Sequence, residues 1–206
     1  MDITKISSKF LGGSFDQNTY VIQNKGEYLL IDAGAEIEDI EKVLGKKKLS
    51  AILITHAHFD HICNLEKIIK KYDCDVYLSA GAEEKLTDCM KNASFMVGQK
   101  MTFNIDRNKV KHYLDEISFK KFKVKVFKTP GHSFDSVCLL IGTNLFTGDT
   151  VFDDFIGRCD LYDGSPTDME NSLKLVRDID FETAYPGHYE QANKEQILKV
   201  ISRIVD

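Results

Sequence analysis

The sequence predicts an α/β fold in which two β-sheets pack together and helices cover both outer faces. Strand-like apolar runs followed by helical runs occur in two rounds along the chain, a pattern typical of that layered arrangement. Several strand-like runs also end in short turns that carry histidine or aspartate, and α/β folds build their sites at such strand ends. With 206 residues the chain is long enough for one sizeable core, so we expect a single domain over residues 1–206.

In the first round the strands are the clearest elements. Residues 1–32 predict a β-meander with turns at Gly12-Gly13 and at 24–26, and 28–31 is a continuous apolar run typical of an inner strand. The elements expected next are a short helix over 36–44, a buried strand over 49–54, a helix over 62–72, a strand over 74–79 and a helix that begins within 81–90.

The second round begins after a segment that lacks a clear pattern. Residues 91–113 carry Met and Phe side chains without a clean period, so either a substrate-facing flap or a satellite core under a loop fits. Residues 119–127 alternate apolar residues with lysines, which predicts a half-buried strand with a solvated lysine face. The later elements expected are strands over 137–141, 145–147 and 181–184 and helices over 168–179 and 194–205.

Composition narrows the classes of function. The formal net charge of −5 argues against a general nucleic-acid binder. No apolar run approaches the roughly 20 residues that span a bilayer, and the N-terminus carries no signal-peptide pattern. Five cysteines form no CxxC pair, which favours a reducing compartment. We therefore expect a cytoplasmic protein that binds a small molecule, without nucleic-acid or membrane partners.

A cluster of metal-ligand side chains lies between the strand over 49–54 and the helix that follows it. The stretch Thr-His-Ala-His-Phe-Asp-His at 55–61 holds three of the six histidines and one carboxylate. Neutral imidazoles and carboxylates are ligands for divalent transition metals, so a chance solvated cluster is the weaker interpretation. His56 and His58, two positions apart on an extended turn, can bind one ion, whereas the adjacent Asp60 and His61 more easily face a second.

Three later turns each place one further ligand-type side chain beyond a strand-like run and beside a glycine. These side chains are His132 after Thr-Pro-Gly, Asp149 after Thr-Gly and His188 after Tyr-Pro-Gly. Glycine permits the tight turns that such positions need. Each residue alone would more often be structural, but together with the run at 56–61 they predict a completed metal shell.

In this order the motifs resemble the metallo-β-lactamase superfamily, over a region from Gly12 to about His188. Within the superfamily the chain looks most like the glyoxalase II-like hydrolases. The stretches that carry this resemblance are FTGDTVF at 146–152, IGRCDL at 156–161, NSL at 171–173 and YPGH at 185–188. The resemblance implies an αββα four-layer sandwich, two mixed sheets covered by helices, with two metal ions at one edge of the sheets.

The resemblance also implies a ligand set and a reaction. One ion would be held by His56, His58 and His132, the other by Asp60, His61 and His188, with Asp149 as the bridge. Two divalent ions, zinc first and iron or manganese as alternatives, could hold a hydroxide that attacks a carbonyl carbon, and Asp60 could also orient it. The implied activity is hydrolysis of a small-molecule thioester, as by a hydroxyacylglutathione hydrolase. Only 18 residues follow His188, so we do not expect the helical domain with which glyoxalase II binds glutathione.

Three other functions fit the same residues. The first is a lactonase or other carboxylic-ester hydrolase of the same fold. The second is a mononuclear iron dioxygenase acting on persulfides, which one metal ion per chain would favour. The third is a metal-binding protein without turnover, for which Asp60→Asn would alter metal affinity alone.

Four residues near the motifs are candidates for roles beside the ligand set. Asp32, in the turn after the strand over 28–31, is either a turn residue or a group that accepts a hydrogen bond from a ligand imidazole. Arg158 and Asp160 are expected to form a salt bridge that ties their loop to the core, and Tyr189 either lines the pocket or is an ordinary exposed tyrosine. Cys63 and Cys159 are expected to be small buried hydrophobic residues rather than nucleophiles.

Overall fold

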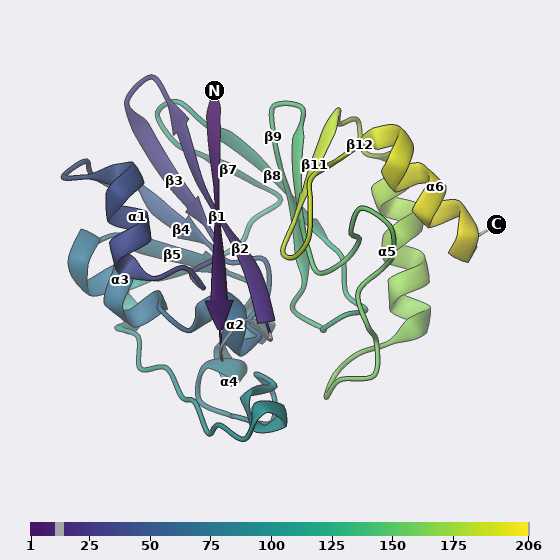
Figure 1. Ribbon diagram of the computed structural model, residues 1–206, viewed down its shortest axis with the longest axis horizontal. Helices are drawn as coiled ribbons and strands as arrows, with labels where there is room; N and C mark the ends of the chain where they lie inside the picture. The colour runs from purple at the N-terminus through teal and green to yellow at the C-terminus, as the bar shows by residue number, and fades with distance from the viewer. Residues whose placement is uncertain (11–14, 206) are drawn as a thin grey trace.

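A computed structural model, which describes residues 1–10 and 15–205, contains two six-stranded sheets within those ranges (Figure 1). Helices α1 and α3 lie beside the first sheet, and α5 and α6 lie beside the second (Figure 1). The predicted fold class is therefore confirmed. The turn predicted at Gly12-Gly13 lies outside the described residues.

The first sheet has the order β1-β2-β3-β4-β5-β6, in which β1 to β3 pair antiparallel and β3 to β6 pair parallel. Its strands are β1 (Asp2–Phe10), β2 (Phe15–Asn24), β3 (Glu27–Ile31), β4 (Ala51–Leu53), β5 (Asp75–Leu78) and β6 (Val110–His112). The central strands β3 and β4 are buried almost completely, which explains why their sequences are continuous apolar runs.

The second sheet has the order β12-β11-β10-β9-β8-β7 and is antiparallel except for the parallel pair β10–β11. Its strands are β7 (Glu116–Ser118), β8 (Lys123–Lys128), β9 (Val137–Ile141), β10 (Asn144–Gly148), β11 (Thr183–Pro186) and β12 (Ala192–Asn193). The lysines at 123, 125 and 128 in β8 are exposed, as the alternating pattern predicts for that strand.

Apolar side chains from both sheets meet between them. Leu29 and Leu53 from the first sheet belong to the same buried cluster as Val124, Leu139 and Phe146 from the second. Two further clusters lie under the helices, one beneath α1 and α3 and the other beneath α5 and α6. The two sheets thus form a rigid support, and the loops at their shared edge carry the candidate site.

The helices begin and end where their local sequence directs. They are α1 (Ile37–Leu44), α2 (Phe59–Ile62), α3 (Leu65–Tyr72), α4 (Glu83–Leu86), α5 (Pro166–Asp178) and α6 (Lys194–Val205). The Ser165 hydroxyl accepts a hydrogen bond from the Asp168 N–H at 3.2 Å and Pro166 takes the first turn, so α5 begins earlier than predicted. No helix among the described residues is long and apolar enough to cross a membrane.

Two predictions about helices in the first half need correction. The helix expected over 62–72 is divided, because α2 already contains Asp60 and His61 and a break at Cys63 and Asn64 separates it from α3. The helix expected from 81 is only one turn long, after a 3₁₀ turn at 80–82. Within residues 91–113, Phe103 joins the first core, as the satellite-core alternative requires, while Met96 and Val97 line a cleft. That the segment faces a substrate stays a prediction.

Candidate metal centre

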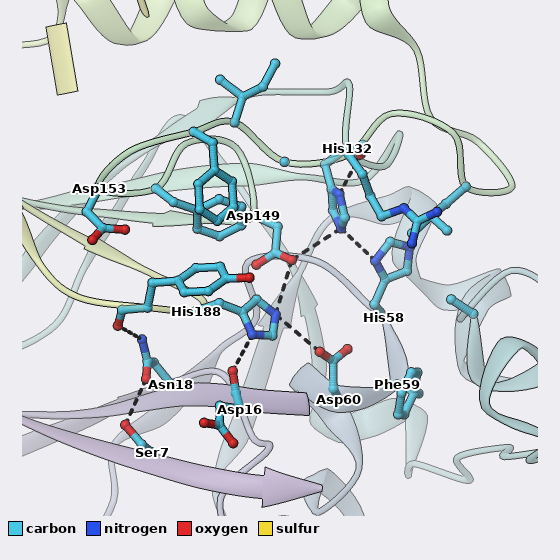
Figure 2. Close-up of a pocket in the computed structure, with 18 of the residues that line it drawn as sticks. Ser7, Asp16, Asn18, His58, Phe59, Asp60, His132, Asp149, Asp153 and His188 are labelled. Carbon is cyan, nitrogen blue, oxygen red and sulfur yellow. Dashed lines mark hydrogen bonds and ion pairs between the residues drawn. The ribbon is translucent and has the colours of Figure 1, made fainter. Parts of the chain in front are cut away.

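The seven predicted ligand side chains converge at one edge of the two sheets. The stretch His56–His61 leaves β4 and enters α2, so the first sheet supplies four of them. His132, Asp149 and His188 follow β8, β10 and β11, so the second sheet supplies the other three. Figure 2 shows His58, Asp60, His132, Asp149 and His188 pointing toward one another across this junction.

Three groups of these residues have their ligand atoms within 4.8 Å of one another, which is close enough to hold a metal ion. We call the first the His triad, and it consists of His56, His58 and His132. We call the second the Asp60 set, and it consists of Asp60, His61 and His188. The remaining group joins His56 and His61 through Asp149.

Asp149 lies between the two ligand sets. Its Oδ2 is 3.4 Å from His132 Nε2 and 3.3 Å from His188 Nε2. Its Oδ1 is 3.3 Å from His61 Nε2. One carboxylate therefore reaches ligand nitrogens of both sets, which is the arrangement that a bridging ligand requires.

The second ring nitrogen of several histidines is occupied by an oxygen acceptor. His61 Nδ1 donates to Asp32 Oδ2 and His132 Nδ1 donates to the Arg158 carbonyl, each at 2.8 Å. His188 Nδ1 donates to the Asp16 carbonyl. Because these acceptors cannot donate, each Nδ1 carries a proton, so Nε2 is the ring nitrogen that remains to face the cluster, as in metal-ligand histidines.

Buried polar atoms of the cluster support a fit to cations. Within the described chain, the unpaired atoms include His56 Nε2, His58 Nε2 and Asp149 Oδ1. The His58 Nδ1 and His132 Nε2 atoms face each other at 2.9 Å, and the His61 and His188 Nε2 atoms at 3.4 Å. Buried polar groups are normally paired, and ring nitrogens that face one another across the cluster in this way are placed to share positive ions.

The two ligand sets differ in their electrostatics. Burial lowers the pKa of His56 and, together with His132, lowers that of His58 to about 3. Burial also disfavours charge on His61 and His188, but Asp149 and the other nearby carboxylates outweigh it and raise their pKa values to about 10 and about 12. His56 and His58 are therefore neutral at pH 7, whereas two imidazoles of the Asp60 set hold protons that an ion would displace.

Glycine 187 allows the last ligand loop to approach the centre. A Cβ at this position would overlap the Asp149 carboxylate and the His61 ring. At Gly148, φ is +50°, a conformation that glycine adopts without strain and that turns Asp149 toward the site. The glycines noted beside the ligands in the sequence thus serve close approach as well as chain reversal.

Asp32 accepts a hydrogen bond from a ligand imidazole, as one of its two interpretations predicts. It is 1% exposed, accepts from His61 Nδ1, and also accepts from the Thr55 N–H at 2.7 Å and from the Thr55 hydroxyl. It is a turn residue as well, because its φ is +59°. The two interpretations of Asp32 in the sequence therefore describe the same residue.

The expectation for Arg158 and Asp160 is partly wrong. The ion pair forms, with Nε–Oδ1 and Nη2–Oδ2 distances of 2.7 and 2.8 Å, but both side chains are exposed and only two residues apart. It therefore joins the loop to itself instead of to the core.

Cys63 and Cys159 are only partly buried, so they are not the core residues expected. Burial raises the pKa of Cys63 to about 12, so it stays a thiol.

An ion pair beneath the His56–His58 turn has no clear signal in the sequence. Lys85 and Asp135 are 2% and 0% exposed at the side chain and their charged atoms are 2.6 Å apart. Asp135 also accepts from the Ala57 N–H at 2.8 Å and from the Ser133 hydroxyl. The nearness of Asp135 to His132 was the only hint, and a lysine in a short helix reads as solvated.

Five of the seven candidate ligands line an open cleft of about 910 Å³; they are His58, Asp60, His132, Asp149 and His188. Its walls include Phe59, Met96 and Val97 from the first half of the chain, and Phe155 and Tyr189 from the second. Tyr189 thus lines the pocket, as one of its two interpretations held.

Comparisons with known proteins agree with this geometry. The family model described as the metallo-beta-lactamase superfamily matches residues 12–188. The probable metallo-hydrolase YqgX of Bacillus subtilis (strain 168) is 31% identical over 185 residues, which cover 85% of this chain and 86% of that protein.

Two solved structures resemble the fold closely. The B3 metallo-beta-lactamase BLEG-1 superposes with a TM-score of 0.88 at 28% identity and covers 100% of both chains. The protein TTHA1623, solved in a di-iron-bound form, superposes with a TM-score of 0.81 at 25% identity and covers 96% of this chain and 98% of that one. The likeness therefore extends over all or nearly all of each chain.

Proposed function

Because this chain belongs to the metallo-β-lactamase superfamily, a superfamily of metallo-hydrolases, we propose that its centre binds two divalent ions and hydrolyses a small-molecule thioester. The position of Asp149 carries the proposal, since its carboxylate lies within 3.4 Å of ligand nitrogens in both the His triad and the Asp60 set. A pair of ions, not a single one, uses all seven ligands. Zinc is the first ion to test, and iron the second, because the similar TTHA1623 was solved with two irons.

Two ions bound there would lower the pKa of a water between them and polarise the substrate carbonyl. Asp60 is ionised already in the metal-free centre, since His61 and His188 outweigh the effect of burial and bring its pKa to about 2. Its role is therefore to accept a hydrogen bond and orient the attacking water, not to store a proton. In the reaction one water is consumed, the carbon–sulfur bond breaks and a carbon–oxygen bond forms, and a carboxylate, a thiol and one proton are released.

The surroundings of the ligands support a leaving group that departs without protonation. Among the described residues that line the cleft, Lys5 and Arg158 are the lysine and the arginine, and both are held in ion pairs, with Glu190 and Asp160. His112, the histidine outside the ligand set, lies on β6 and pairs with Glu83. A thiol with a pKa near 8.5 leaves as the thiolate, whereas an amine needs a proton.

The test is turnover of thioesters by protein of known metal content. S-lactoylglutathione and an uncharged acyl thioester are the first substrates, with a β-lactam in the same panel because BLEG-1 is described as a B3 metallo-beta-lactamase. We expect thioester hydrolysis by protein with two ions per chain, and its loss in Asp149→Ala but not in Asp154→Ala, whose carboxylate is exposed. No thioester turnover in protein that holds two ions refutes the assignment. One ion per chain with persulfide oxidation supports the dioxygenase instead.

A further inference from the structure

Three aromatic side chains form a wall beside the last metal-ligand histidine. Phe152 and Phe155 come from the loop after β10, and Tyr189 follows His188 directly. The ring centroids are 5.1 Å apart for Phe152 and Phe155, 4.8 Å for Phe155 and Tyr189, and 5.4 Å for Phe152 and Tyr189. The Phe152 centroid is 6.1 Å from that of His188, so this aromatic wall begins at the metal centre.

The outer part of the aromatic wall is open to the cleft. Phe152 is buried, but Phe155 and Tyr189 are 44% and 55% exposed and both line the cleft. Met96, 59% exposed, adds another apolar side chain to the cleft lining. Large apolar side chains that stay exposed together around a pocket mark a surface that binds something apolar.

The backbone at Tyr189 shows that the ring is not needed for the turn. Its φ is +63°, a conformation that is unfavourable for a bulky side chain and free of strain for glycine. The loop is held through the Tyr189 carbonyl, which accepts from Asn18 Nδ2 at 2.9 Å and from Lys5 Nζ at 3.4 Å. Glycine would keep both hydrogen bonds without the strain, so the loop does not need a tyrosine for its own conformation. Residues with strained backbone angles cluster at binding sites, which points to a role for the tyrosine ring there.

The charges of the cleft disfavour an anionic substrate group. Lys5 pairs with Glu190 at 2.7 Å, and Arg158 is held by Asp160. Asp16 and Asp153 also line the cleft and have no ion pair within the described ranges. An anionic group such as the carboxylates of a glutathione conjugate would therefore find no unpaired lysine or arginine among the described residues of the cleft, whereas an uncharged apolar group needs none.

We propose that the aromatic wall of Phe152, Phe155 and Tyr189 is the subsite for an uncharged apolar acyl group, so that the substrates are apolar acyl thioesters. This inference rests on the proposed function for the hydrolysis of thioesters, but the binding of an apolar chain to the aromatic wall does not depend on it. An apolar acyl group attached to a carbonyl at the metal centre would lie against rings that begin at His188. Each methylene that reaches the wall should improve binding about fourfold.

The experiment measures two quantities on metal-loaded full-length protein. The first is kcat/KM for acetyl, butyryl, hexanoyl, octanoyl and succinyl thioesters of one uncharged thiol. The second is the dissociation constant of octanoate and of acetate by calorimetry, which needs no turnover. We expect kcat/KM to rise along the uncharged series, with succinyl below butyryl, and octanoate to bind at least about tenfold more tightly than acetate.

The variants are Phe155→Ala, Tyr189→Gly, the apolar replacement Phe155→Leu and the control Tyr162→Ala. Tyr162 is 63% exposed and lies outside the cleft lining, so its variant should keep the wild-type preference. Phe155→Ala and Tyr189→Gly should each reduce the octanoyl-to-acetyl ratio about tenfold or more, and Phe155→Leu should restore part of it. Thermal unfolding checks that each variant is folded.

The outcomes separate the subsite from the reaction. A chain-length preference unchanged in both Phe155→Ala and Tyr189→Gly, or a preference for succinyl over butyryl, overturns the subsite even when thioesters are hydrolysed. If no thioester is hydrolysed, the proposed function fails, and tight octanoate binding that is lost in the two variants still supports the subsite. Equal binding of octanoate and acetate overturns it.

Discussion

Replacing Asp32 by asparagine should weaken one metal site and leave the other intact. Asp32 accepts a hydrogen bond from His61 Nδ1 at 2.8 Å, which leaves His61 Nε2 free as a ligand in the Asp60 set. The asparagine oxygen can keep the bond from the Thr55 N–H, and asparagine tolerates the φ of +59° at this position. Its amide nitrogen, however, would donate to His61 Nδ1 and move the ring proton to Nε2, which is the ligand atom.

The expected loss of metal affinity follows from the loss of the hydrogen bond that orients the His61 ring. Loss of the partner of a metal-ligand histidine typically costs about 10–100-fold in metal affinity, which corresponds to about 1.4–2.7 kcal/mol. The substitution also removes one of the carboxylates that attract positive charge at His61. Of the His triad, His58 and His132 make no hydrogen bond to Asp32. His56 is linked to Asp32 only through the Thr55 hydroxyl, from which the asparagine oxygen can still accept. Affinity at the His triad should therefore stay within about threefold of wild type, or about 0.7 kcal/mol.

Competition with a chromophoric chelator measures the two affinities, and elemental analysis measures the number of ions retained per chain. We expect Asp32→Asn to lose one ion at a chelator concentration at which the wild type keeps two. Asp154→Asn, the same change at an exposed carboxylate, should keep both. Equal weakening of the two ions, or no weakening of either, would refute the reasoning.

Three further predictions concern protons, close packing and buried charge. Because carboxylates raise two imidazole pKa values in the Asp60 set to about 10 and about 12, metal-free protein is stabilised by those protons below pH 6.5 and loses that stabilisation as pH rises through the raised values. The ion that enters this set should therefore release protons, and its affinity should rise about tenfold per pH unit for each proton released. Calorimetry in two buffers measures the number of protons released. An affinity that does not change with pH would contradict this prediction. Gly187→Ala should reduce metal retention with little change in helix content, since a Cβ there overlaps the Asp149 carboxylate, and full retention of two ions would show that the loop can move aside. Lys85→Met leaves the Asp135 carboxylate buried without its cation and should lower the free energy of unfolding by about 3–5 kcal/mol in urea titrations, whereas a change below about 1 kcal/mol would mean that the pair is dispensable.

The ligand positions could be predicted because each depends on a short stretch of chain. A buried strand followed by Gly-His, Gly-Asp or a His-rich turn determines locally where the side chain points, and parallel or neighbouring strands bring those ends together. Helix α6 could also be predicted from its local sequence, and its bounds match the predicted 194–205. Its buried residues Ile197, Val200 and Ile201 recur at helical spacing.

Other features could not be predicted because they depend on contacts between distant residues. Phe155 and Tyr189 are 34 positions apart, and nothing near either one indicates that their rings touch. Lys85 reads as a solvated helical lysine until Asp135 is placed beside it by the fold. The helix predicted over 62–72 kept its apolar period through Cys63 and Asn64, so periodicity alone could not show the break that the ligand turn imposes.

The division of the ligands between the two sheets has a consequence for how the protein matures. The His triad takes two members from the turn after β4 and one from the loop after β8, and the Asp60 set takes two from the first sheet and one, His188, from the second. Neither half alone can therefore chelate an ion with three protein ligands. We therefore expect metal binding to follow the docking of the two halves. The binding free energy of a bound ion would then oppose their separation. The concentration of available metal would set the lifetime of the docked form as well as the activity.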